Sequence, residues 1–157
     1  MLQPASYNTN AKYTLNNPID KIASTSELTY EYEKILDPEK PVVLVLTDHK
    51  GCYQKSDVEA DLIAFLAHKL IMSNSISPDQ IAIISPHRAQ NNAIIKKLEE
   101  IVPIKNLPLV DTVERIQGEE RDVIIFGITC SDIDHLQSDF LNSPNRLNVA
   151  MTRAKTK

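Results

Sequence analysis

Glycine is scarce in this chain of 157 residues, which contains only Gly51, Gly118 and Gly127. A phosphate-binding loop of the Walker type needs two glycines ahead of a Lys-Ser or Lys-Thr pair, because its backbone wraps closely around the phosphates. No segment of the sequence offers that combination. The chain therefore lacks a phosphate loop of its own and cannot build a nucleotide site of that kind alone.

Features that would assign the chain to a secreted or membrane-bound class are missing as well. Its two cysteines, Cys52 and Cys130, are far apart and have no metal-ligand spacing around them, so we expect free thiols. The first twenty residues are polar, and no apolar run approaches the length of a membrane span. These absences predict an intracellular, cytoplasmic protein with no membrane partner.

The residues that are present describe one globular domain. The chain is 42% hydrophobic and 24% charged, which is ordinary for a folded protein, and it is long enough to bury a core. Its formal net charge of −4 argues against a surface that grips nucleic acid everywhere. A local basic patch is present at the C-terminus, where the stretch 142–157 contains Arg146, Arg153, Lys155 and Lys157 and no acid.

Strand and helix patterns alternate from about residue 41 onward. Short apolar, β-rich runs predict strands at 41–47, 81–85, 107–112 and 122–130. Apolar residues at helical spacing predict helices over 56–73, 88–101 and 142–157, the first opened by Ser56 and Glu59 in capping-box spacing. The alternation predicts an α/β fold in which a parallel sheet has helices on both faces. Residues 1–40 are richer in Asn, Thr, Ser and Pro, and we predict a partly ordered leader there, with room for a short helix at 26–36.

In such sheets ligands bind at the carboxyl ends of the strands, so the loops after residues 47, 85 and 112 are the expected sites. After residue 85 a helix begins near Arg88, and a helix N-terminus attracts phosphate. Arg146 and Arg153 are seven residues apart, which on one helix places them on the same face about 10 Å apart. Guanidinium groups bind phosphate oxygens in pairs of hydrogen bonds. A solvated helix face explains the same spacing, so chemistry does not follow from it alone.

Three segments together resemble a known family. "ISPHRAQ" (84–90) is similar to motif IV of superfamily 1 helicases, "VDTVERIQGEERDVIIFG" (110–127) resembles motif V, and "NRLNVAMTRAK" (145–155) resembles motif VI. "PVVLVLTDHKG" and "SDVEADLIAFLAHKL" resemble the region that follows motif III. The similarity runs from about residue 41 to 155. It is closest to the 5′-to-3′ group, which includes the nonsense-mediated-decay helicase and its DNA-replication relatives.

The resemblance implies that residues 41–157 are the second RecA-like domain of a helicase, ending shortly after motif VI, where family members continue into a further strand. In this family ATP with Mg²⁺ binds between two such domains, and the first domain carries the phosphate loop and the acidic metal-binding motif. This first domain would be the partner of the chain, together with single-stranded DNA or RNA. The isolated chain is then expected to be inactive in ATP hydrolysis.

The resemblance also assigns roles to individual residues. It makes Arg153 an arginine finger, with Arg146 as its helper, because such cations stabilise charge on the transferring phosphoryl group. It places Gln117, Gly118 and Glu120 at the nucleotide, with Glu120 at the ribose hydroxyl. The remaining roles fall on Arg88 as a possible second cation for the nucleotide, and on Ser85, Pro86 and Thr112 along the single-strand track.

Two positions depart from the family pattern, and other functions remain open. His87 stands where relatives often have Tyr, and Asn91 stands where some relatives have a second arginine finger. One alternative is a catalytically silent RecA-like module that binds nucleic acid or protein. Another is a metal nuclease that uses Asp132 and Asp134, although solvated acidic loops are common and we predict no metal site. Tyr30, Tyr32 and Tyr53 are expected in packing or surface roles rather than as base-stacking platforms.

Overall fold

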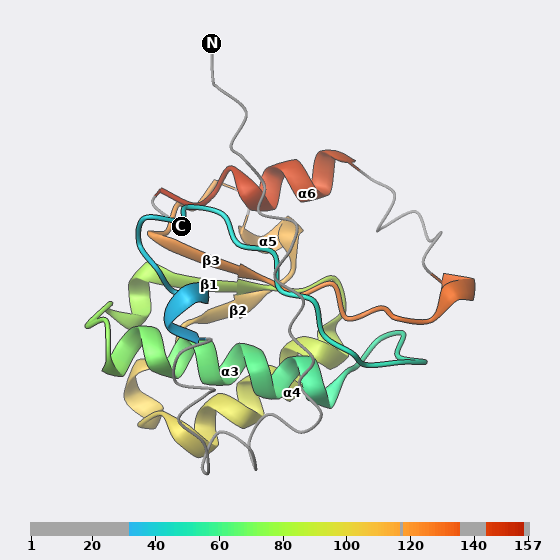
Figure 1. The fold of residues 1–157 in the computed structure, drawn as a ribbon, viewed down its shortest axis with the longest axis horizontal. Helices are drawn as coiled ribbons and strands as arrows, with labels where there is room; N and C mark the ends of the chain where they lie inside the picture. The colour runs from blue at the N-terminus through green and yellow to red at the C-terminus, as the bar shows by residue number, and fades with distance from the viewer. Residues whose placement is uncertain (1–31, 117, 136–143, 156–157) are drawn as a thin grey trace.

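The computed structural model describes residues 32–116, 118–135 and 144–155 (Figure 1). Its centre is a parallel sheet in the strand order β2-β1-β3. The strands are β1 (Ile81–Ile84), β2 (Leu109–Asp111) and β3 (Val123–Phe126). Strand β1 pairs in parallel with both neighbours, opposite Leu109 on one side and Val123 on the other. The predicted parallel α/β sheet is confirmed, with β2 and β3 shorter than the apolar runs that announced them.

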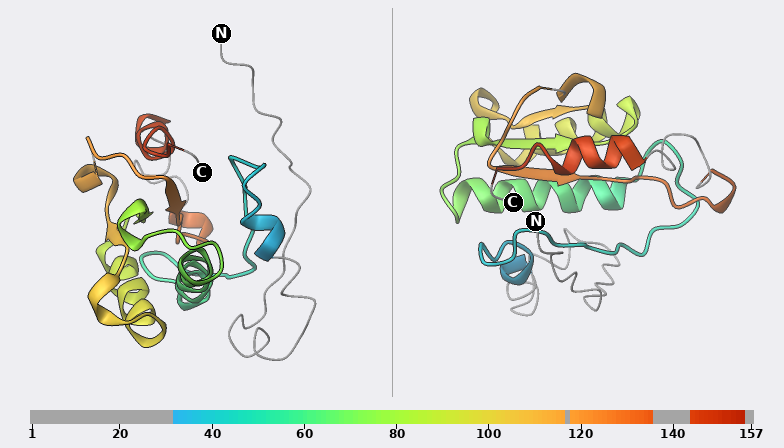
Figure 2. Two further views of the ribbon diagram at one scale, coloured as in Figure 1. Left: turned by 90° about the vertical axis from the view of Figure 1, so that its left-hand side faces the viewer. Right: turned by 90° about the horizontal axis from the view of Figure 1, so that it is seen from above.

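Helices cover both faces of this sheet (Figure 2). The helices are α3 (Asp57–Met72), α4 (Arg88–Ile101), α5 (Val113–Ile116) and α6 (Pro144–Met151), with short 3₁₀ turns η1 (Pro78–Gln80), η2 (Ile104–Asn106) and η3 (Ile133–His135). Alternate residues of β1 point to opposite layers. Ile81 and Ile83 join the core beneath α3 and α4, whereas Ala82 and Ile84 join the core beneath α5 and α6. All four are fully buried, which is why this strand reads as a continuous apolar run. None of the described helices is long and apolar enough to cross a membrane.

The start of α3 follows only half of the predicted capping box. The hydroxyl of Ser56 accepts a hydrogen bond from the backbone N–H of Glu59 (3.2 Å), as the spacing predicts. The reciprocal bond is absent, because the backbone N–H of Ser56 donates instead to Oε1 of Gln90 in α4 (2.8 Å). The Glu59 side chain is thereby released to turn toward the interior, where it is 8% exposed.

The segment 41–47 has no regular secondary structure and is not the strand that its composition predicts. Val43 and Val45 pack against the core, whereas Val42, Leu44 and Leu46 are 48%, 57% and 45% exposed. A strand requires a hydrogen-bonded neighbour, and no described residue forms a ladder with this segment. The prediction of a strand buried on both faces is therefore wrong for the described part of the chain.

The closing helix is shorter than predicted. Helix α6 ends at Met151, and Arg153 lies beyond it in a turn. From there the backbone pairs in parallel with Arg121: the N–H of Arg121 donates to the Arg153 carbonyl (3.0 Å), and the N–H of Lys155 donates to the Arg121 carbonyl (2.7 Å). These bonds replace the i to i−4 bonds that would continue a helix. The expectation that Arg146 and Arg153 share one helix is therefore wrong.

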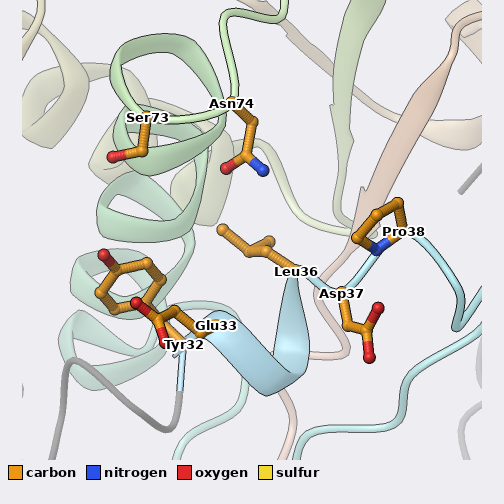
Figure 3. A pocket seen from close by; sticks show the side chains of 7 residues that line it. All are labelled: Tyr32, Glu33, Leu36, Asp37, Pro38, Ser73 and Asn74. Carbon is orange, nitrogen blue, oxygen red and sulfur yellow. The ribbon is translucent and has the colours of Figure 1, made fainter.

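Part of the predicted leader packs onto the domain. Residues 32–35 form a helical turn, and Ile35 and Leu36 are each 7% exposed within the core cluster of α3 and α4. The ring of Tyr32 meets Phe65 of α3 edge to face, with centroids 5.6 Å apart. A hollow lies between this turn and the C-terminal end of α3 (Figure 3), lined by Tyr32, Glu33, Leu36, Asp37, Pro38, Ser73 and Asn74. None of these lining residues belongs to the loops that follow the strands. Residues 1–31 lie outside the described part.

Candidate functional site

The loops after β1, β2 and β3 start side by side at the carboxyl edge of the sheet. The backbone N–H of Ser85 donates to the carbonyl of Asp111 (3.3 Å), and that of Gly127 donates to the carbonyl of Ile84 (2.9 Å). Ser85 is fully buried, and its hydroxyl lies 2.8 Å from Oδ1 of Asn91 and 3.2 Å from the His87 carbonyl. The side chain of Ser85 therefore braces the loop internally, and it is the residues after it that reach the surface.

Pro86 and Thr112 are the partly exposed members of the predicted single-strand track. Thr112 follows β2 directly, and its carbonyl accepts hydrogen bonds from the N–H groups of Arg115 (3.1 Å) and Ile116 (3.3 Å). Thr112 is thus fixed as the residue that opens α5. Parallel pairing of β1 with β2 holds both track residues at one edge of the sheet.

The start of α4 contributes a cation to the same edge. Arg88 is the first residue of α4 and is exposed, and His87 precedes it in an extended conformation. Burial lowers the pKa of His87 below its ordinary value, so this imidazole is neutral at pH 7. Asn91, at the position of a family arginine finger, is 5% exposed and is bonded to Ser85. This residue supports the loop from inside the domain.

A buried polar network, which the sequence analysis did not predict, connects the carboxyl edge of the sheet to α3 and α4. The carboxylate of Glu59 accepts hydrogen bonds from the backbone N–H of Thr129 (3.0 Å) and from Nε2 of Gln90 (3.0 Å). The amide of Gln90 also bonds both backbone groups of Ser56. Thr129 has a φ of 68°, a left-handed conformation that is costly for a β-branched residue. The network therefore holds the loop after β3 in a shape that this loop would not adopt alone.

Gly127, at the end of β3, is needed for the same network to close. A Cβ at this position would lie 2.9 Å from Cδ1 of Ile63 and 3.2 Å from the carboxyl group of Glu59. A side chain there would push the Glu59 carboxylate away from its donors. The absence of a side chain lets α3 approach β3 closely enough for the loop to be anchored.

The residues predicted for the nucleotide gather at the other end of β3. The N–H of Glu119 donates to the Ile116 carbonyl (3.0 Å), and Gly118 before it has a φ of 92°, a left-handed conformation that glycine adopts readily. Glu120 follows, exposed, with Nζ of Lys155 3.9 Å from its carboxylate. Gln117 lies outside the described residues.

Arg153 is brought to this turn by backbone pairing with Arg121 rather than by a helix face. Its residue is partly buried, and its Nε atom is buried with no hydrogen-bond partner within the described ranges. No carboxylate among the described residues neutralises its guanidinium group. The backbone of Arg146 lies in α6, and its side chain is outside the described part.

The predicted residues therefore form two groups. Gly118 and Glu120 precede β3, and the backbone of Arg153 pairs with Arg121 at the same amino end, whereas Ser85, Pro86, Arg88 and Thr112 lie around the carboxyl ends of β1 and β2. Because the three strands are parallel, the two groups lie at opposite ends of the sheet, on the order of 20 Å apart at about 3.3 Å per strand residue. Arg88 is consequently not brought together with Arg153.

The described part of the acidic loop after β3 ends at residue 135. Among the described residues, no group of three or more His, Cys, Asp or Glu side chains could hold a metal ion. Asp132 interacts instead with the ring of His135 (Nδ1 to Oδ2, 3.5 Å), and its other oxygen accepts from the backbone N–H of Asp134 (3.0 Å). These contacts are those of a self-supporting loop.

An aromatic contact at the carboxyl edge was also missed by sequence reasoning. The rings of Tyr53, His87 and His135 meet there, although they come from three loops that are remote in the sequence. No local pattern links such positions. Only the parallel sheet, which brings the loops to one edge, creates the cluster.

Comparison with known proteins identifies relatives that are similar to this chain in sequence. The model of a family described as an AAA domain matches residues 7–157. The DNA replication ATP-dependent helicase/nuclease DNA2 of Xenopus tropicalis is 32% identical over 130 residues, the putative helicase MOV-10 of Gallus gallus 35% over 119, and the putative regulator of nonsense transcripts 1 of Takifugu rubripes 29% over 131. The alignments cover 78%, 62% and 75% of this chain, but only 12%, 12% and 11% of the relatives. The chain thus corresponds to about a tenth of the length of these curated relatives.

Proposed function

Since the chain belongs to the AAA domain family and is a superfamily 1 helicase-like domain, we propose that it acts as the second RecA-like motor domain of an ATP-dependent helicase. ATP and Mg²⁺ are then held mainly by a first RecA-like domain, because this chain has no phosphate loop. Hydrolysis would open and close the cleft between the domains and move them along single-stranded DNA or RNA. We place this activity inside the cell, in the cytoplasm, which suits the two free thiols.

The proposal rests on one observation, the position of Arg153 and its unpaired guanidinium group. The backbone pairing with Arg121 holds Arg153 at the amino end of β3, the end that Gly118 and Glu120 precede, while its guanidinium has no carboxylate partner among the described residues. A partly buried, unpaired cation is costly unless a charged ligand completes it. A γ-phosphate presented by a facing domain supplies that charge, and Arg153 then stabilises the transition state as an arginine finger. We assign Arg146 and Gln117 to the same cleft from their positions in the motifs.

The carboxyl edge is the proposed single-strand track. Pro86 and Thr112 offer loop surface there, Ser85 braces the loop from within, and Arg88 supplies an exposed cation at a helix N-terminus. We therefore assign Arg88 to a backbone phosphate of the strand rather than to the nucleotide. Contacts of this kind read the backbone, so little base specificity is expected.

The test is ATP hydrolysis by the chain fused to a first RecA-like domain that carries a phosphate loop and an acidic Mg²⁺-binding motif. We expect hydrolysis stimulated by single-stranded nucleic acid, and a loss of about 10³-fold or more in kcat with Arg153→Ala. Arg153→Lys should restore little, because an ammonium cannot make the bidentate contact. Lys96→Ala, which removes an exposed cation of α4, is the matched control and should leave kcat unchanged.

Either of two results would contradict the motor. An inert fusion protein that still binds oligonucleotides would favour a catalytically silent binding module. Steady hydrolysis by the 157-residue chain alone, abolished by Arg153→Ala, would mean that the chain contains a complete nucleotide site, contrary to its lack of a phosphate loop.

A further inference from the structure

Three rings from three different loops form a cluster at the carboxyl edge of the sheet. Tyr53 precedes α3, His87 links β1 to α4, and His135 ends η3 after β3. The rings of Tyr53 and His135 are stacked, with centroids 4.0 Å apart and planes 28° from parallel. The His87 ring meets Tyr53 edge to face, with centroids 5.4 Å apart at 62°. The edge-to-face contact lies within the preferred range of ring separations, and the stacked pair is closer than that range.

Hydrogen bonds join the loop that contains Tyr53 to the loop that contains His135. The carbonyl of Cys52 accepts from the N–H groups of Ser131 (2.7 Å) and Asp132 (3.0 Å), and the hydroxyl of Ser131 accepts from the N–H of Cys52 (3.0 Å). Tyr53 and His135 are within four residues of these bonds. The stack is therefore built on a fixed base, so its rings need little ordering when a ligand arrives.

The cluster is accessible and lies beside the proposed track. Tyr53 and His87 are partly exposed, and the His135 side chain is 45% exposed. Stacking on Tyr53 covers one face of the His135 ring, and its exposed surface can receive another flat group. His87 is covalently next to Pro86, which places the rings at the end of the track. The position is the edge at which parallel α/β sheets bind ligands.

The charge around the rings determines which part of a nucleic acid can bind. The carboxylates of Asp132 and Asp134 lie in the same loop as His135, and that of Asp132 is 3.5 Å from its Nδ1. Negative carboxylates repel a phosphate, whereas the uncharged face of a base is tolerated. An aromatic surface flanked by acids thus fits a base better than the sugar-phosphate backbone.

We propose that Tyr53, His87 and His135 form a stacking platform for a base of the single strand, a role that rests on the proposed helicase function. The phosphates on either side of that base are bound elsewhere on the track, and the platform binds the base by its face. Because every base has such a face, the platform holds DNA and RNA with little sequence preference. It fixes the position of the strand at this end of the domain.

The chain offers a direct probe, because it has only four histidines: His49, His68, His87 and His135. Their ring Cε1–H signals can be followed by proton NMR and assigned with single His→Gln variants. We would titrate the 157-residue chain with oligo(dT), with oligo(rU) and with an abasic oligodeoxynucleotide of the same length. Ring currents of a stacked base should shift the His135 signal with both base-containing strands and not with the abasic strand.

Affinity provides the second readout. Tyr53→Ala and His135→Ala should each weaken binding of oligo(dT) by about tenfold, and change binding of the abasic strand less than twofold. Tyr53→Phe keeps the ring and should bind like the wild type. His68 lies within α3 and belongs to none of the three loops, so an unchanged His68 signal shows that a variant is folded. If Tyr53→Ala does not fold, His135→Ala, at an exposed position, provides the test.

The proposal is overturned if the abasic strand binds as tightly as oligo(dT), if the His135 signal does not respond to bases, or if no oligonucleotide binds. A response to only one of oligo(dT) and oligo(rU) would also contradict it, because a platform that binds the face of a base should hold both. These results are independent of ATP hydrolysis. A base-dependent shift in a chain whose fusion protein is inert would sustain the platform and remove the motor.

Discussion

Replacing Glu59 by Gln tests whether the buried network stabilises the domain. The two carboxylate oxygens accept from Thr129 N–H and from Nε2 of Gln90, each at 3.0 Å. A glutamine has almost the same shape but only one acceptor oxygen. Whichever way its amide is turned, its NH₂ group meets another donor, so one hydrogen bond to a charged acceptor is lost inside the protein. Such a loss costs about 1.5–3 kcal/mol.

The loss in the free energy of unfolding is partly offset, because Glu59→Gln no longer buries a charge. Glu59 is 8% exposed and has no cationic partner among the described residues, so its carboxylate is stabilised by hydrogen bonds alone. We expect the hydrogen bonds to prevail, with a net loss of about 2 kcal/mol in the free energy of unfolding. For a chain of this size that corresponds to a fall of roughly 4–8 °C in Tm.

Urea unfolding at pH 7, followed by circular dichroism, measures the difference. Glu99→Gln makes the same chemical change at an exposed position of α4, and it should alter the free energy of unfolding by no more than about 0.5 kcal/mol. If Glu59→Gln is as stable as the wild type or more stable, the cost of burying the charge exceeds the value of its bonds. The network would then have to be explained by the shape of the loop and not by its stability.

Two further predictions concern the backbone and pH. Gly118→Ala should lower the free energy of unfolding by about 1–2 kcal/mol, because the φ of 92° is unfavourable for a residue with a Cβ. No atom lies within 4 Å of a Cβ placed there, so the loss comes from the backbone conformation and not from a clash. Equal stability in urea would contradict this reasoning. Burial lowers the pKa of His87, and burial with the charge of Lys69 lowers that of His68, so the unfolded chain takes up protons first as the pH falls through about 6.5. Stability contributed by the neutral imidazoles is therefore present above that pH and lost below it. His68→Gln should show a smaller loss between pH 7.5 and 5.5 than the wild type, and an equal loss would refute the assignment.

Local sequence patterns predict the centre of this domain well because its elements are set by local burial. β1 is apolar at every position since both of its faces are covered, and α4 occupies 88–101 as its apolar spacing predicts. The wrong predictions fall where contacts between segments distant in the sequence determine the secondary structure. The run 41–47 has strand composition but no described neighbour with which to form a ladder, and α6 stops early because residues 153–155 pair with Arg121.

The same distinction applies to the candidate site. The family resemblance pointed to Glu120 and Arg153, and backbone pairing near Arg121 does bring their segments together. It could not reveal that Arg88 lies at the other end of the sheet, since that depends on strand direction. Nor could it reveal the contact of Tyr53 with His135, because neither residue belongs to a motif and only the meeting of two loops creates it.

The free side of β3 has a consequence for how the domain behaves in solution. β3 pairs with β1 on one side, and among the described residues its other side is met only by the single bridge from Ala154 to Arg121, before the strand begins. Within the described ranges no strand pairs with that side of Val123–Phe126, and an unpaired strand edge is a template for another extended chain. The exposed side chains of Val42, Leu44 and Leu46 add apolar surface. At high concentration the domain should therefore self-associate through this edge and the apolar surface beside residues 42–46, and Leu44→Lys should reduce the association measured by light scattering.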